Sequence, residues 1–144
     1  MEIKYQVFEN EKLLIQKFIG FFSIELYMQY APTILRNPAM RSIDKVLIDF
    51  REIDFSNVPS DFDEGLSRMT EMRKNIQEKE IKRNDVTIVF WVDKPIPTVI
   101  AQVFQENFPN YKYCSTAKSV LENFKITDPL FDLEKIVENL ENTF

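Results

Sequence analysis

Apolar and polar residues alternate along the beginning of the chain, and this alternation predicts a β-hairpin. It runs through residues 3–8, is interrupted by the polar run Glu-Asn-Glu-Lys and resumes over residues 13–19. Two later segments, residues 44–50 and 85–92, are almost continuously apolar, which is typical of strands covered on both faces. A shorter alternating segment at residues 111–115 completes a set of about five predicted strands.

Apolar residues recur at helical spacing between these strands. Such stripes predict helices over residues 24–35, 62–79, 96–108 and 116–124. Ser23 precedes the first stripe and can cap its helix, whereas Pro32 lies inside the stripe and predicts a kink or a break. The alternation of strands and helices predicts an α/β fold, with a single mixed, mostly parallel sheet and helices on both faces.

The last segment, residues 126–144, is predicted to add an amphipathic helix to a core of residues 1–125. Asp128 is placed to cap this helix, and Pro129 to occupy its first position. The apolar face of the helix consists of Leu133, Ile136, Val137 and Leu140. Because so short a helix is marginal alone, this face must dock either on the chain's own sheet or a neighbouring helix, or on a second copy. We expect a homodimer of single domains that each span residues 1–144.

The composition excludes several classes of function. The 144 residues include no histidine, one cysteine and two glycines. Without histidine, Ser-His and Cys-His catalysis and histidine-ligated metals are excluded, and two glycines cannot build a P-loop or a dinucleotide-binding loop. The net charge is −5 and the basic residues are scattered, so no nucleic-acid partner is expected.

The sequence also bears on location. Its beginning lacks the basic and apolar regions of a signal peptide, and no apolar run approaches the roughly 20 residues of a membrane span. Cys114 is the single cysteine, so it has no intrachain partner for a disulfide. We therefore expect a cytoplasmic protein.

Several segments resemble the STAS-like fold of anti-sigma-factor antagonists. They are the hairpin followed by FIGFFSIE, the strands VLIDFREIDF and VTIVFWV, and the segment YCSTAKSVLENF. The chain is most similar to a divergent branch that is grouped with the CRAL-TRIO lipid-transfer domain. In that branch a strand ends in an Asp-x-Arg step, which Asp49 and Arg51 match here. The resemblance covers about residues 3–124 and implies the fold more than the function.

Regulatory members of that family carry a phosphorylated serine in an Asp-Ser-(Ser/Thr)-Gly step at the head of a helix. The corresponding stretch here is FSNVPSDFDEG, where Ser56 and Ser60 are candidates by position but lack this step. We favour a helix cap for Ser60 over phosphorylation. Serine is a preferred cap, and a phosphate beside Asp61 and Asp63 would be repelled.

Charged residues follow the third and fourth predicted strands, at the edge where open α/β sheets bind ligands. They are Asp49, Arg51, Asp54, Asp93 and Lys94. These residues form a candidate ligand or partner edge, and a carboxylate-based site there would make the chain an enzyme. We favour a structural ion pair, because neither a nucleophile nor a histidine accompanies them. No metal and no cofactor is predicted.

The abundance of Phe is consistent either with a packed core or with a cavity for an apolar ligand, lined also by methionines. The methionines in question are Met28, Met40, Met69 and Met72. From the resemblance we expect a non-catalytic regulatory module that acts through protein–protein contact, in signalling. A binding protein for an apolar or lipid-like small ligand is the alternative, and an enzyme is the third possibility.

Overall fold

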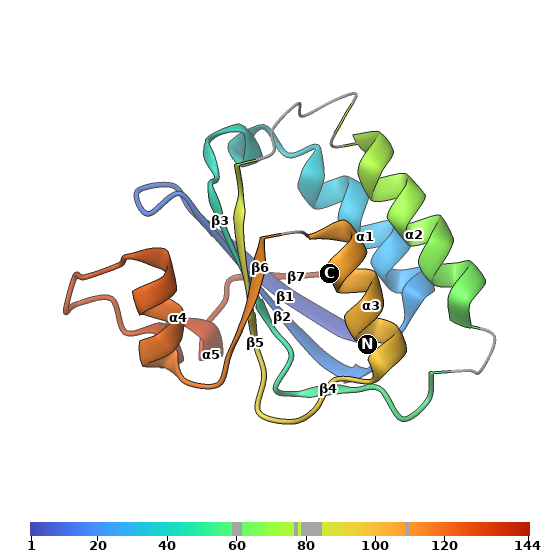
Figure 1. The fold of residues 1–144 in the computed structure, drawn as a ribbon. Coiled ribbons are helices and arrows are strands. Elements are labelled where there is room, and N and C mark those ends of the chain that lie inside the picture. Colours follow the sequence, from blue (N-terminus) through green and yellow to red (C-terminus); the bar gives the residue numbers. More distant parts are fainter. Residues whose placement is uncertain (59–61, 77, 79–84, 109) are drawn as a thin grey trace.

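The computed structural model describes residues 1–58, 62–76, 78, 85–108 and 110–144, which form a sheet between two layers of helices (Figure 1). The strands are β1 (Glu2–Phe8), β2 (Leu13–Phe21), β3 (Lys45–Asp49), β4 (Ile53–Asp54), β5 (Thr87–Trp91), β6 (Tyr111–Cys114) and β7 (Asn142–Thr143). Within the described residues the mixed sheet thus has seven strands, which confirms the α/β class and corrects the predicted number of about five. The two additional strands, β4 and β7, have two residues each and are too short to show a period.

The strand order is β6-β5-β3-β2-β1-β7, with β4 paired to β2 beside this path. β1 and β2 form the predicted antiparallel hairpin, and β2, β3, β5 and β6 are parallel neighbours. Because parallel strands end at the same edge, residues from all four lie in one row across that edge. The row runs Lys17, Asp49, Trp91 and Cys114.

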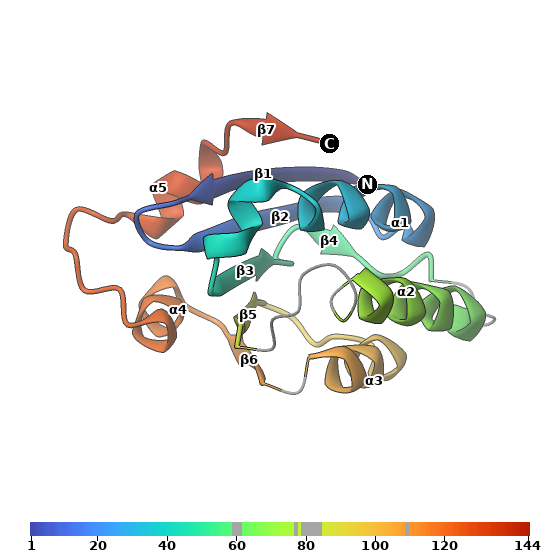
Figure 2. The same ribbon diagram turned by 90° about the horizontal axis from the view of Figure 1, so that it is seen from above.

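Helices cover both faces of the sheet, as expected (Figure 2). One face carries α1 (Ile24–Leu35), the 3-10 helix η1 (Pro38–Ser42), α2 (Phe62–Ile76) and α3 (Thr98–Asn107). The other face carries α4 (Ala117–Phe124) and α5 (Leu133–Glu138). Each face buries its own apolar cluster, and β3 and β5 contribute to both, which explains why their sequences are almost continuously apolar.

The helices α1 and α2 lie side by side over the first face. The hydroxyl of Ser23 accepts a hydrogen bond from the Leu26 amide at 3.2 Å, so Ser23 is the predicted cap of α1. Pro32 does not break the helix, which continues to Leu35 because residues on either side of the proline are buried on the sheet. In α2, Gly65 allows a close approach to α1, since a Cβ there would lie 2.9 Å from Cδ1 of Ile24.

The C-terminal segment differs from the prediction. α5 begins at Leu133, and its cap is Asp132, whose carboxylate accepts a hydrogen bond from the Lys135 amide at 3.2 Å. Asp128 accepts instead from the Leu130 amide at 2.9 Å, in a turn that precedes the helix. A local Asx turn therefore takes the residues that the sequence pattern assigned to a first helical turn.

After α5 the chain returns to the sheet as β7, antiparallel to β1. The amide of Phe144 donates to the carbonyl of Ile3 at 2.8 Å. Residues 126–144 thus supply both a covering helix and an edge strand to the same sheet. No helix in the described part of the chain is both long and apolar enough to cross a membrane.

Candidate ligand-binding cavity

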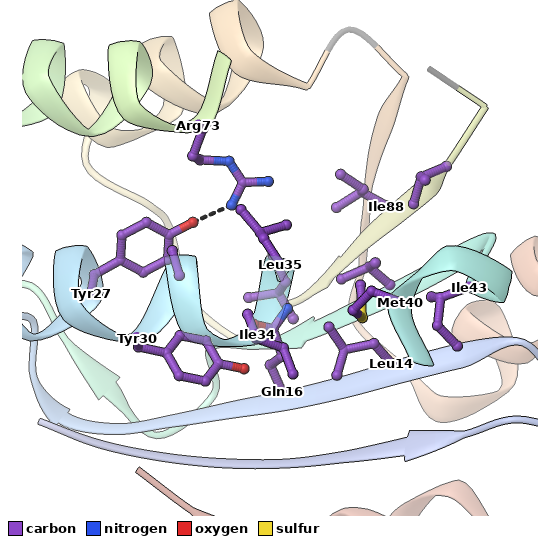
Figure 3. Close-up of a pocket in the computed structure, with 14 residues that line it drawn as sticks. Leu14, Gln16, Tyr27, Tyr30, Ile34, Leu35, Met40, Ile43, Arg73 and Ile88 are labelled. Carbon is purple, nitrogen blue, oxygen red and sulfur yellow. Dashed lines mark hydrogen bonds between the residues drawn. The ribbon is translucent and has the colours of Figure 1, made fainter. Parts of the chain in front are cut away.

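A cavity of about 60 Å³ lies between the sheet and the layer formed by α1, η1 and α2 (Figure 3). Its wall is mostly apolar, and includes Leu14, Ile34, Ile43, Val46, Ile48 and Ile88. Four polar side chains line the same cavity, namely Gln16, Tyr27, Tyr30 and Arg73. An apolar wall with a few convergent polar groups is the usual composition of a small-molecule site.

The fold brings these polar groups together from three elements. Gln16 lies on the same face of β2 as Leu14, because alternate residues of a strand share a face. Tyr27 and Tyr30 are three residues apart in α1 and therefore neighbours along one side of that helix. Arg73 reaches down from α2 toward Tyr27 (Figure 3).

Arg73 is held on two sides. Its Nη1 donates a hydrogen bond to the hydroxyl oxygen of Tyr27, and its Cζ lies 4.3 Å from the ring centroid of Phe108. Its Nε is buried and has no hydrogen-bond partner in the structure described. No carboxylate among the described residues forms an ion pair with this guanidinium. Arg73 therefore presents a positioned cationic donor that the rest of the described chain does not neutralise.

Tyr30 supplies a second buried polar atom. Its side chain is 1% exposed, and its hydroxyl has no hydrogen-bond partner among the described residues. Its ring packs edge-on against Tyr5 and Phe18, with centroid distances of 5.5 and 6.3 Å. Burial raises the pKa of this phenol above its ordinary value, neighbouring tyrosines add to the rise, and Arg73 only partly opposes it. The hydroxyl is therefore protonated at neutral pH and able to donate.

This arrangement is suited to binding. A neutral phenol and a permanently charged guanidinium both donate hydrogen bonds near neutral pH. A buried polar group without a partner costs roughly 1–3 kcal/mol, and two such groups line this cavity. A bound molecule with acceptor atoms would remove that cost.

The predicted edge of the sheet contains a closed ion pair. Asp49 is fully buried, and its carboxylate accepts three hydrogen bonds from Arg51, at 3.0 Å from the amide, 2.9 Å from Nε and 2.8 Å from Nη2. Cζ of Arg51 lies 3.4 Å from the ring centroid of Trp91. The hydrogen bond to Asp49 is the main reason that the pKa of Arg51 is raised. Both carboxylate oxygens are thus engaged, as in the structural pair that we favoured.

The other predicted edge residues lie around this pair. Asp93 is exposed and close enough to Arg51 to contribute to its raised pKa. Hydrogen bonds from Ser56 are the main reason that the pKa of Asp54 is lowered. Lys94 is exposed, and its positive charge lowers that pKa further. The structure therefore brings the five predicted charges to one edge, but it engages the buried carboxylate completely. No group of three Asp, Glu or Cys side chains that could hold a metal ion occurs among the described residues.

Of the two candidate phosphorylation sites, Ser56 lies within the described residues and Ser60 does not. The amide of Ser56 donates to the Asp54 carboxylate at 2.8 Å, and the side chain of Ser56 also bonds to this carboxylate. A phosphate on Ser56 would therefore face a carboxylate at hydrogen-bond distance and be repelled. Ser60, which the sequence predicts to cap α2, lies outside the described residues.

The apolar face of α5 is covered by the chain itself. Leu133 and Val137 of α5 are 2% and 1% exposed, and Ile136 is partly buried. Leu140, which was predicted on the same helix, follows its end and is 8% exposed. These side chains pack in the cluster that also contains Val89 of β5. The helix therefore docks within its own chain, on the sheet and on the neighbouring helix α4, and the residues predicted as a dimer face are not left exposed for a second copy.

No protein-family model matches the chain, and no curated protein is significantly similar to it in sequence.

The sequence pattern did not single out the polar residues of the cavity. Tyr27 stood within the apolar stripe of α1, and of the four methionines considered, Met40 lines the cavity. One signal was present in the printed sequence: Gln16 stands between Leu14 and Phe18 on the face of the second hairpin strand that α1 covers. Arg73 carried no comparable signal, because arginine is ordinary near the end of an amphipathic helix.

Proposed function

We propose that this chain is a non-catalytic binding protein for a small, largely apolar molecule that occupies the cavity beneath α1 and α2. One observation carries the proposal. Two side chains that line this mostly apolar cavity, Tyr30 and Arg73, each have a buried polar atom without a hydrogen-bond partner, Oη and Nε respectively. Buried polar groups in native proteins nearly always have hydrogen-bond partners. A third unpartnered atom, Nε1 of Trp91, belongs to the cluster on the opposite face and does not line this cavity.

The volume sets the size of the ligand. Drug-sized molecules occupy pockets of roughly 300–1,000 Å³, whereas one water needs only about 10–15 Å³. The cavity of about 60 Å³ lies between these limits. It favours a molecule of a few heavy atoms over the long acyl chain of a lipid.

The test combines mass spectrometry with a variant that fills the cavity. Native mass spectrometry of the protein purified from its own source should show a retained small mass. The variant Ala31→Leu, which places a larger side chain in the cavity wall, should lose that mass and the binding of small probes such as 1-butanol. Ala117→Leu in α4 is the matched control, because it makes the same change on the other face of the sheet. A retained mass or probe binding that survives Ala31→Leu would contradict the proposal.

The regulatory function implied by the STAS-like resemblance stays a prediction, as do a protein partner and a cytoplasmic location. The regulatory function is supported by the order of strands and helices together with the Asp49-x-Arg51 step. The same mass spectra address it, because a co-purified protein in place of a small molecule would favour the interaction module.

A further inference from the structure

We propose that the ligand of this cavity is a small monocarboxylate, whose carboxylate is held by Arg73, Tyr27 and Tyr30 while its short apolar tail lies against the sheet. This inference rests on the function proposed above and names the chemistry of the ligand. It follows from the kind of polar groups present, from their charge and from the space beside them.

The polar groups offer hydrogen-bond donors. Nη1 of Arg73 already donates to the oxygen of Tyr27, which leaves the hydroxyl proton of Tyr27 free to donate to a ligand. Nε–H of Arg73 and O–H of Tyr30 are buried without a partner among the described residues. Arg73 and Tyr27 are hydrogen-bonded to each other, and Tyr30 lines the same cavity. Three donors on side chains that line one apolar cavity favour a ligand rich in acceptors.

The charge indicates an anion. Arg73 is the single charged side chain among the described residues that line the cavity, and no described carboxylate pairs with it. Arg73 is partly buried, and a counter-charge or several acceptors stabilise the part of a guanidinium that is withdrawn from water. One cation balances a monoanion, whereas a phosphate dianion would leave excess negative charge among apolar side chains. A carboxylate also fits the planar guanidinium, which binds it with two parallel hydrogen bonds.

The guanidinium is preorganised for this role. The hydrogen bond to Tyr27 and the ring of Phe108 fix it before any ligand arrives. Leu14 and Ile88, labelled in Figure 3, line the same cavity as the guanidinium. Val46 adds to this apolar wall on the strands. A cavity of about 60 Å³ leaves room beside the carboxylate for a tail of only a few carbons.

Calorimetric titration of the full chain with sodium butyrate and with butyramide tests the proposal, since the two probes match in shape and differ in charge. We expect butyrate to bind about 10- to 100-fold more tightly, the range for hydrogen bonds to a charged group. Arg73→Met should abolish that preference and leave butyramide binding within about twofold, because the removed interaction is with the charge. Lys74→Met, an exposed neighbour on the same helix, is the matched control and should change neither affinity.

Two outcomes overturn the inference in distinguishable ways. Equal binding of butyrate and butyramide, with both lost in Ala31→Leu, would reject the carboxylate and keep the proposed cavity function. Failure of both probes and of 1-butanol to bind would reject both. If Arg73→Met does not fold, Tyr30→Phe replaces it, because that change removes one donor and keeps the ring. It should weaken butyrate more than butyramide, and an equal effect on the two probes would count against the inference.

Discussion

The guanidinium of Arg51 lies against the indole of Trp91, with Cζ 3.4 Å from the ring centroid, while its Nε and Nη2 bind the buried carboxylate of Asp49. The three residues join the ends of β3 and β5 at the carboxyl edge of the sheet, since Asp49 and Trp91 are register partners. Trp91 is the single tryptophan of the chain, so its fluorescence reports directly on this edge.

Asp49→Asn should therefore lower the free energy of unfolding by roughly 3 kcal/mol, the lower end of the range for a broken buried ion pair. The lower end applies because the Arg51 side chain is 27% exposed and can regain water. Urea unfolding followed by Trp91 fluorescence measures the change. Asp93→Asn, at an exposed neighbouring position, should change stability by less than about 0.5 kcal/mol. A catalytic turnover that disappears in a folded Asp49→Asn variant would mean that the pair is not merely structural.

Leu133→Ala should lower stability by about 2–5 kcal/mol, because it opens a space in the cluster between α5 and the sheet. Its effect on the molecular mass seen by light scattering should be nil, since the side chain is buried within one chain. Glu138→Ala, exposed in the same helix, is the control. If this face served a second copy instead, Leu133→Ala would lower the mass and leave the stability of the monomer almost unchanged.

Ser23→Ala should cost about 0.5–2 kcal/mol, the usual range for removing a helix cap. The residue matters for the cavity because α1 carries Tyr27 and Tyr30. Thr116→Ala, which removes the equivalent cap of α4, should cost a similar amount without affecting ligand binding. Thermal unfolding with and without butyrate separates the two effects. Equal stability of Ser23→Ala and the unaltered chain would show that the hydrogen bond to Leu26 contributes nothing.

The stability of the chain should fall as the pH rises above the ordinary range of tyrosine. Burial, with a smaller contribution from Tyr111, raises the pKa of Tyr113 to about 12 from the ordinary value of 10.0. Tyr113 therefore keeps its hydroxyl proton to a higher pH in the folded chain than in the unfolded chain. The stability that this residue contributes is complete below about pH 10 and is lost as the pH rises toward about 12. Urea unfolding across this window should show a shallower decline in Tyr113→Phe. Identical declines in stability for the unaltered chain and for Tyr113→Phe would show that the pKa of Tyr113 is not raised.

The periodicity of the sequence determined the hairpin, the strands β3, β5 and β6, and the placement of helices between them. These elements are specified locally, because a strand that is buried on both faces must be apolar throughout and a half-buried helix must carry a stripe. The sequence also predicted the pairing of Asp49 with Arg51, but by strand alternation. In the structure Arg51 lies in the turn after β3, where its amide and side chain both donate to the Asp49 carboxylate.

Other features were decided by the tertiary structure. The two-residue strands β4 and β7 exist only because β2 and β1 offer unpaired backbone groups at their edges. α5 begins at Leu133 because its apolar side chains fill the space beside Val89, and Asp128 closes a turn instead. The cavity itself is the clearest case. Its polar side chains, Gln16, Tyr30 and Arg73, come from three separate elements. A local sequence pattern cannot show that a buried donor lacks a hydrogen-bond partner, because this depends on every atom around the donor.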